Sequence, residues 1–339
     1  MTGAHSFPMI TPRRAAFTLI ELLVSMAILV LLITVVVQIV DGAQKTTGAS
    51  KSRLECDAEA RTVFDRMAMD FGRMVNRKDV DFIVNKDAGN DSIYFFSEAP
   101  AIWTDATNPQ QPVSLVGYRV NTDYQLERLG KGLTWDVAPP DGPVYLTYQQ
   151  PTGPPPPPPA TPTPTPNPIS GSTLTGSNFG TVITAASDPK GNSPYHVIGS
   201  NVFRMEVSFL LRPYADPASG NLVAASYSVS PYIKNHQTGV GATTSGQISN
   251  NGVGLSDVQA ITVTIALMDS KSNQMITKGG TDFSAFSTLV SDFPDAVNNE
   301  APAKAWNAAI PTIAAINPKS ATSQIRVYQR TFVLNSNGN

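Results

Sequence analysis

The charged residue that stands out most in this sequence is Glu21, which lies inside a long apolar run. The surrounding residues, 13–40, read RRAAFTLIELLVSMAILVLLITVVVQIV. A run of roughly 20 apolar residues is long enough to cross a bilayer as a helix. A carboxylate in hydrocarbon is costly even on lenient insertion scales, so it calls for a functional explanation. Glu21 therefore needs a partner, or it reaches back to the membrane surface one turn away.

The other side chains that could do chemistry form no recognisable site. His5, His196 and His236 have no metal-ligand spacing to one another or to a cysteine. The sequence contains no G-x-S-x-G motif for a nucleophilic serine and no standard glycine-rich phosphate loop. We therefore predict that the chain is not an enzyme and that it binds no cofactor.

Four acids in the C-terminal part could in principle hold calcium: Asp282, Asp292, Asp295 and Glu300. Their spacing matches no calcium loop, so we interpret them as solvated loop residues and predict no metal site. The single cysteine, Cys56, excludes an internal disulfide bond. We interpret Cys56 as a small buried apolar residue of a helix.

The segment Arg13–Glu21 resembles the N-terminal signature of type IV prepilins and type II secretion pseudopilins. The resemblance rests on Phe-Thr-Leu-Ile-Glu directly after a short leader that ends with a basic pair. It implies that a prepilin peptidase cuts between Ala16 and Phe17 and that the new α-amino group of Phe17 is methylated. The chain departs from the family at Ala16, where glycine is usual, but alanine is also small enough for cleavage.

The resemblance also implies a role for Glu21. In the family, the glutamate at the fifth mature position is thought to pair with the N-terminal amine of a neighbouring subunit, while the apolar helix forms the filament core. Opposite charges attract strongly in a low dielectric and are costly unpaired, so such a pair would fix the register between helices. The alternative is an uncleaved signal anchor. A cleaved secretory signal peptide fits poorly, because the run is too long and no small-x-small site closes it.

The charge balance argues against nucleic acid as a partner. The chain has 24 Lys and Arg against 26 Asp and Glu, a net charge of −2, so no broad basic face is expected. Arg13 and Arg14 before the span are balanced by Lys45, Lys51 and Arg53 after it, so the positive-inside rule does not decide orientation. The resemblance implies a single-pass protein of the bacterial inner membrane with its C-terminal domain in the periplasm.

Composition and periodicity divide the chain into six segments. We expect a leader peptide at 1–16, a transmembrane and assembly helix at 17–40, an amphipathic continuation of the helix at 41–77, the first part of a β-rich domain at 78–150, a Pro/Gly/Ser-rich loop or linker at 151–193, and the second part of the β-rich domain at 194–339. The Pro-rich segment either separates two domains or is inserted within one sheet, and the resemblance favours insertion.

The continuation of the helix carries an apolar stripe. Ala60, Phe64, Met67, Phe71 and Met74 follow a 4-3-4-3 spacing, so they share one helical face that we expect to pack on the β-domain. Charged residues occupy the rest at i,i+4 spacing, pairing Asp57 with Arg61, Arg61 with Asp65 and Arg66 with Asp70; we interpret them as a solvated face.

Downstream of residue 77 the pattern is that of strands. We predict strands at 92–97, 113–120, 124–129, 133–135, 197–198, 202–212, 222–229, 258–268 and 324–334, and short helices at 283–289 and 301–316. The segment 258–268 has the clearest alternation and is predicted to be a core strand, and 324–334 is predicted to close the sheet.

The order of these segments resembles the J-type minor pseudopilins. The shared features are a long helix, the strand around Gly117–Arg119, the segment Leu126–Arg128, and a terminal strand around Arg330–Leu334. The long proline-rich and polar inserts also resemble large prepilin-like cassette proteins of verrucomicrobial genomes.

The fold class that follows is α+β and pilin-like: a long N-terminal helix, transmembrane in its first half, packed on an antiparallel β-sheet domain with polar insertions. We interpret the protein as a structural subunit of a periplasmic pseudopilus serving a type II-like secretion system. Its partners would be other pseudopilins or pilins, the prepilin peptidase and the inner membrane. The alternatives are a minor type IV pilin for adhesion or DNA uptake, and a membrane-anchored periplasmic binding protein or enzyme.

Overall fold

The computed structural model divides the chain into two compact units, residues 1–51 and 52–339, which are described separately below. The structure describes these residues: 18–76, 82–86, 89–100, 112–132, 193–216, 219–231, 247–249, 255, 257–278, 284–293, 300, 302–313 and 319–334. The leader 1–16, the strand predicted at 133–135 and nearly all of the Pro-rich segment lie outside the described residues.

The first helix, α1, spans Leu19–Gly72. In the second unit its apolar stripe is buried as predicted, with Ala60, Phe64, Met67 and Phe71 each at most 6% exposed. Met74 lies beyond the end of the helix, where it forms an isolated β-bridge with Ser97 and is partly buried. The 4-3 spacing thus identified the face of the helix that packs on the β-domain.

Six antiparallel strands form the first sheet in the order β10-β1-β2-β3-β4-β5. Their bounds are Ile83–Asn85 for β1, Ser92–Ser97 for β2, Ser114–Val120 for β3, Leu126–Gly132 for β4, Tyr195–Gly199 for β5 and Gln247–Ser249 for β10. The predicted hairpin is β3 and β4, joined at Asn121, whose side-chain oxygen accepts from the N–H groups of Asp123 and Gln125. The sequence missed β1 and β10, which are only three residues long.

Four strands form the second sheet in the order β12-β11-β6-β9. Their bounds are Val202–Leu211 for β6, Ser226–Ser228 for β9, Val258–Leu267 for β11 and Arg326–Val333 for β12, and a separate small ribbon pairs β7, Tyr214–Ala215, with β8, Leu222–Val223. The alternating segment forms β11, whose side chains are buried on both faces apart from Gln259, and the last strand closes this sheet, as predicted.

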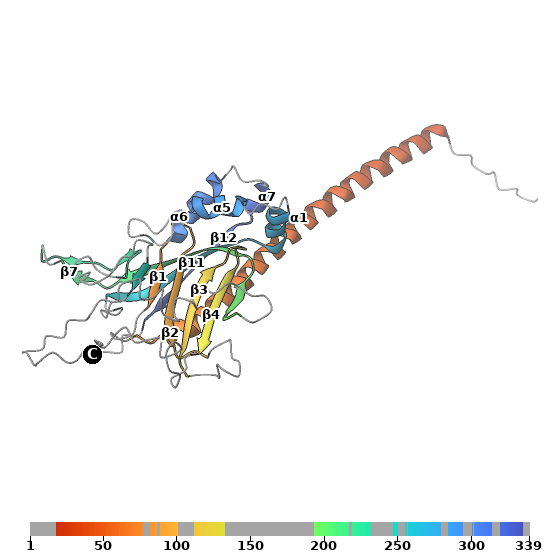
Figure 1. Cartoon of the computed structure of the whole chain (residues 1–339). Helices are drawn as coiled ribbons and strands as arrows, with labels where there is room; N and C mark the ends of the chain where they lie inside the picture. Colours follow the sequence, from red (N-terminus) through yellow and green to blue (C-terminus); the bar gives the residue numbers. More distant parts are fainter. Residues whose placement is uncertain are drawn as a thin grey trace, which may run out of the picture. The chain divides into compact units, whose positions relative to one another are not determined.

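Short helices follow β11 in the chain, and side chains of several of them join the second apolar cluster. They are α4 at Ser270–Lys278, α5 at Ser284–Asp292, α6 at Pro302–Ala309, a 3-10 turn at Ile310–Thr312 and α7 at Lys319–Thr322. The cluster contains Phe203, Phe286, Phe293 and Trp306. Figure 1 shows α5, α6 and α7 together beside the second sheet. The sequence predicted α5 and α6 but missed α4 and α7, which are short and polar.

The main apolar core joins residues 56–71 of α1 to both sheets. It contains Phe64 and Phe71 from α1, Phe95 from β2, Phe209 from β6 and Phe332 from β12. Phe71 stacks on Phe95 with ring centroids 4.8 Å apart and lies 5.0 Å from the ring of Phe332. The fold is therefore α+β, with a long N-terminal helix packed by its second half on antiparallel sheets, as the sequence predicted.

The Pro-rich segment connects two neighbouring strands of one sheet. β4 ends at Gly132 and β5 begins at Tyr195, and the two pair antiparallel, with Leu129 opposite Tyr195 and Leu126 opposite Gly199. This connectivity is that of an insertion within a sheet, because the strands on its two sides are hydrogen-bonded to each other.

A buried ion pair fastens α1 to the first sheet. Asp70 is fully buried and receives two hydrogen bonds from Arg128 of β4, Nε to Oδ2 at 2.5 Å and an Nη to Oδ1 at 2.9 Å. The Tyr118 hydroxyl also donates to Asp70, and Arg66 approaches it at 3.5 Å. Burial, and after it the adjacent Asp70 carboxylate, raises the pKa of the Tyr118 phenol well above its usual value, so Tyr118 remains a donor.

The interpretation of the charged face of α1 as solvated is therefore wrong at Asp70. Arg61 does approach Asp65, at 3.7 Å, but Asp57 accepts from the Tyr328 hydroxyl and Asp65 from Arg330, at 2.7 Å. The Arg330 hydrogen bond keeps the pKa of the Asp65 carboxyl below its usual value. These partners lie far along the chain, so i,i+4 spacing could not reveal them.

Substitution of Arg128 by Met is expected to destabilise the β-domain severely, because it leaves Asp70 buried without its main charged partner. We expect a loss of roughly 3–5 kcal/mol in the free energy of unfolding, measured by denaturant unfolding of the detergent-solubilised protein. The matched control is Arg61→Met, which removes an exposed arginine beside Asp65 and should cost less than about 1 kcal/mol. Equal stability losses in the two variants would contradict the anchoring role of Asp70.

Candidate functional site

The start of α1 is closed by reciprocal hydrogen bonds between Thr18 and Glu21. The backbone N–H of Glu21 donates to Thr18 Oγ1 at 3.3 Å. In return, Glu21 Oε2 accepts from both the backbone N–H and the hydroxyl of Thr18, each at 3.0 Å. This arrangement is a capping box, in which an N-cap hydroxyl and a carboxylate three residues later satisfy helix-end donors that otherwise lack partners.

The capping box gives the Glu21 carboxylate a partner within its own chain. From the sequence we expected Glu21 to meet a neighbouring subunit's amine or the membrane surface, and Thr18 was not predicted as its partner. The signal was present in the sequence as Thr-x-x-Glu immediately before an apolar run. A carboxylate has about four acceptor positions, so these two bonds leave capacity for a further donor.

The predicted processing residues, Ala16 and Phe17, lie outside the described residues. Cleavage between them and methylation of Phe17 therefore stay predictions, as does the pairing of Glu21 with an amine. The structure places Glu21 on the first turn of α1, three residues from Thr18 at the beginning of the described chain.

The first unit contains an exposed apolar surface on α1. From Leu19 to Val40 the large apolar side chains are exposed, between 44% at Val35 and 83% at Leu19. By length and composition this part of α1 is a candidate membrane span, and none of its apolar window is buried. Such a continuous apolar surface is not stable in water, so a bilayer or other apolar helices must cover it.

The other candidate residues form no site in the described part of the chain. Glu300 pairs with Lys304 at 2.7 Å and Asp292 is exposed, whereas Asp282 and Asp295 lie outside the described residues. Within those residues, no group of three or more His, Cys, Asp or Glu side chains gathers in a way that could hold a metal ion. His196 lies on β5, and His5 and His236 are not described.

Cys56 is 1% exposed in the core, as predicted. Burial and, after it, the nearby Asp269, Glu55 and Glu59 carboxylates raise the pKa of its thiol to about 12. At neutral pH Cys56 is therefore a thiol, which is unreactive compared with a thiolate.

Comparison with known proteins supports the resemblance of the N-terminal segment to type IV prepilins. Residues 11–37 match the model of the prokaryotic N-terminal methylation motif. Among solved structures, the chain is similar to a type IV-like pilin from Thermus thermophilus, with 11% sequence identity and a TM-score of 0.27. The match covers 83% of this chain and 94% of that one. A likeness this weak carries no argument about the fold. No curated protein matches the sequence. This match confirms the predicted methylation motif: residues 11–37 are type IV prepilin-like.

The capping box predicts a local effect of Thr18→Ala. Loss of an N-cap hydroxyl typically costs about 1 kcal/mol, so the Glu21 amide should exchange with solvent about five times faster. Amide exchange measured by NMR in detergent micelles tests this expectation. The control is Thr34→Ala, which removes a hydroxyl that donates to the Val30 carbonyl within the helix at 2.8 Å and should leave Glu21 unchanged. Unaltered exchange in Thr18→Ala would show that the box does not hold the helix start.

Proposed function

We propose that this protein is a pilin-like filament subunit that is cut before Phe17, methylated there, and assembled into a periplasmic pseudopilus of a type II-like secretion system. The observation that carries the proposal is the exposed apolar half of α1, which begins with a capped glutamate directly inside a match to the methylation motif. An apolar helix of this kind can pass from a bilayer to a bundle of like helices, because both cover its side chains.

Glu21 sets the register in this proposal. In the free subunit its carboxylate is held by Thr18, which lowers the cost of placing it near hydrocarbon. During assembly the remaining acceptor capacity receives the N-terminal amine of a neighbour. Two opposite charges in an apolar surrounding attract strongly and are costly when separated, so a subunit one turn out of register, which leaves both charges unpaired, is disfavoured.

The partners of the protein follow from this role. They are other pseudopilins or pilins in a mixed filament, the prepilin peptidase that removes residues 1–16, and the inner membrane that holds α1 before assembly. The second unit, residues 52–339, lies in the periplasm in this proposal.

Substitution of Glu21 by Ala is expected to leave membrane insertion intact and to impair assembly. A photoreactive amino acid in place of Leu32, whose side chain is 55% exposed on the apolar helix, reports contacts between subunits. We expect at least a roughly fivefold loss of crosslinked adducts in Glu21→Ala, since the partner amine is then unpaired. The control is Asp41→Ala, which removes an exposed acid that pairs with Lys45 at 2.8 Å. Full crosslinking in Glu21→Ala would rule out the register role.

The small side chain at Ala16 is expected to be required for processing. Ala16→Leu should block removal of the leader, because the bulky side chain lies next to the scissile bond, while Ala15→Leu should be processed. Both variants would be produced together with a prepilin peptidase and followed by the shift in gel mobility of the membrane protein. Normal processing of Ala16→Leu would contradict the assigned cleavage position.

A further inference from the structure

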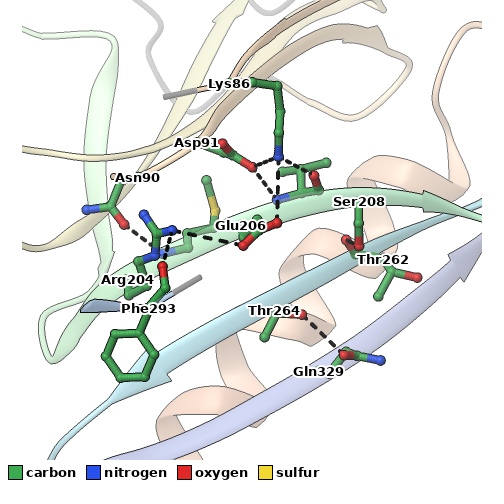
Figure 2. A network of polar contacts seen from close by, with 12 residues as sticks. Lys86, Asn90, Asp91, Arg204, Glu206, Ser208, Thr262, Thr264, Phe293 and Gln329 are labelled. Atoms are coloured by element: carbon green, nitrogen blue, oxygen red, sulfur yellow. Dashed lines mark hydrogen bonds and ion pairs between the residues drawn. The ribbon is translucent and has the colours of Figure 1, made fainter. Parts of the chain in front are cut away.

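A buried cluster of charges lies where the β1–β2 hairpin meets β6. Lys86 follows β1, Asp91 precedes β2, and Glu206 and Arg204 lie on β6 (Figure 2). The side chains of Asp91, Glu206 and Arg204 are fully buried, and that of Lys86 is 13% exposed. Among the described residues, two cations and two anions thus lie together away from water.

The amine of Lys86 lies against the carboxyl group of Asp91. Lys86 Nζ contacts Asp91 Oδ2, and the two residues occupy the next opposed positions after the paired Asn85 and Ser92. Lys86 Nζ also donates to the Val207 carbonyl at 2.8 Å. The hairpin register and β6 therefore fix the amine and the carboxyl group in contact, as bond formation between them requires.

We propose that Lys86 and Asp91 condense into an intramolecular isopeptide bond, with Glu206 as the proton relay. The Lys86 nitrogen forms a bond to Asp91 Cγ, one carboxyl oxygen leaves as water, and an ammonium and a carboxylate become a neutral amide. No oxidant, reductant or further reactant is needed. Because one positive and one negative charge disappear together, the Arg204–Glu206 pair that remains is still balanced.

The polar groups around Asp91 suit this reaction. Asp91 Oδ2 accepts the Val207 N–H at 2.8 Å, which would stabilise the negative charge that develops on this oxygen during attack. The other oxygen, Oδ1, is buried and finds no hydrogen-bond donor among the described residues, so it is the oxygen that departs. Attack on a carboxyl group requires its neutral form, and burial raises the pKa of Asp91 to about 6 despite the opposing charge of Lys86.

Glu206 is placed to carry the proton. Its Oε1 lies 3.9 Å from Lys86 Nζ, and its Oε2 lies 4.0 Å from an Nη of Arg204. Arg204 is held in turn by the Phe293 carbonyl at 3.3 Å and by the Trp306 ring, 5.4 Å from its guanidinium carbon. Glu206 accepts a proton from the attacking nitrogen and returns it to the departing oxygen; such contacts are commonly longer before reaction than during it.

Proximity supplies the driving force. Amide formation from separate acids and amines is unfavourable in water, but well-oriented groups within one molecule reach effective concentrations of about 10⁵–10⁸ M. Burial also favours the amide, because a buried ammonium and carboxylate lose more hydration free energy than a buried neutral amide does.

The bond would lock the loop that covers the open edge of β6. β9 pairs with β6 only from Phe209 to Leu211, and Asn90 and Asp91 hydrogen-bond to the edge before it. Asn90 Oδ1 accepts from the Met205 N–H at 2.8 Å and its Nδ2 donates to the Phe203 carbonyl at 3.1 Å, while the Asp91 N–H donates to the Met205 carbonyl at 3.1 Å. In the periplasmic location proposed above, the isopeptide bond would keep this edge closed in a chain whose single cysteine allows no internal disulfide.

Peptide mass spectrometry of the full-length protein tests the proposal. Trypsin cannot cleave after an acylated lysine, so we expect one peptide spanning residues 79–119 that is about 18 Da, one water, lighter than its sequence mass. The loss should lie within residues 86–91 in the fragment spectrum. Cleavage after Lys86 at full mass would overturn the proposal.

Substitutions distinguish the bond from other water losses, such as a cyclic imide at an aspartate. Lys86→Arg keeps the charge but offers no comparable nucleophile, so the loss should disappear; its persistence would overturn the proposal. Asp91→Asn should lose about 17 Da, one ammonia, instead of water. Lys304→Arg, at an exposed ion pair, is the matched control and should retain the 18 Da loss in the 79–119 peptide.

The relay role of Glu206 has its own test. Glu206→Gln, checked for folding by circular dichroism, should slow the reaction so that the unreacted peptides predominate. A complete water loss in Glu206→Gln would refute the relay. A folded Glu206→Gln protein with unreacted peptides would support the relay. If the substitution acted only by disrupting the structure, the circular dichroism spectrum would change as well.

Discussion

The structure depends first on the apolar surface of α1 between Leu19 and Val40, which the described part of the chain leaves exposed. Side chains of this number and kind must be covered by lipid or by other apolar helices. Every other feature of the N-terminal segment follows from this requirement. The N–H groups at the start of the helix need acceptors, which the Thr18–Glu21 box supplies for Thr18 and Glu21, and a carboxylate placed there must have partners.

The same chain then changes the character of its helix to suit a water-soluble domain. Beyond Ser52 the apolar residues narrow to one stripe, and Asp70 joins the helix to β4 through Arg128. A single buried charge would be prohibitive there, but two hydrogen bonds from the guanidinium and one from Tyr118 satisfy it. These hydrogen bonds specify where along the sheet the helix lies, because any shift of the helix would separate Asp70 from its donors.

The sequence predicted most of the regular elements because their patterns are local. The 4-3 spacing of Ala60, Phe64, Met67 and Phe71 and the alternation of residues 258–268 each report one buried face directly. The sequence did not predict contacts between residues that are far apart in the chain. Arg128 is 58 positions from Asp70, and Glu206 is far from Lys86 and Asp91. One signal was visible in the sequence but unused, namely two charged residues, Arg204 and Glu206, at alternate positions of a mostly apolar strand. Short elements such as β1, β10, α4 and α7 carry too few residues to show a period.

We propose that α1 is a processed assembly helix and not a permanent anchor. The most direct measurement is the N-terminal residue of the membrane-extracted protein, produced together with a prepilin peptidase and identified by mass spectrometry of its N-terminal peptide. The account predicts a peptide that begins at Phe17 and carries a methyl group on its α-amine. A protein that still begins at Met1, with the peptidase active on a known substrate in the same cells, would contradict it.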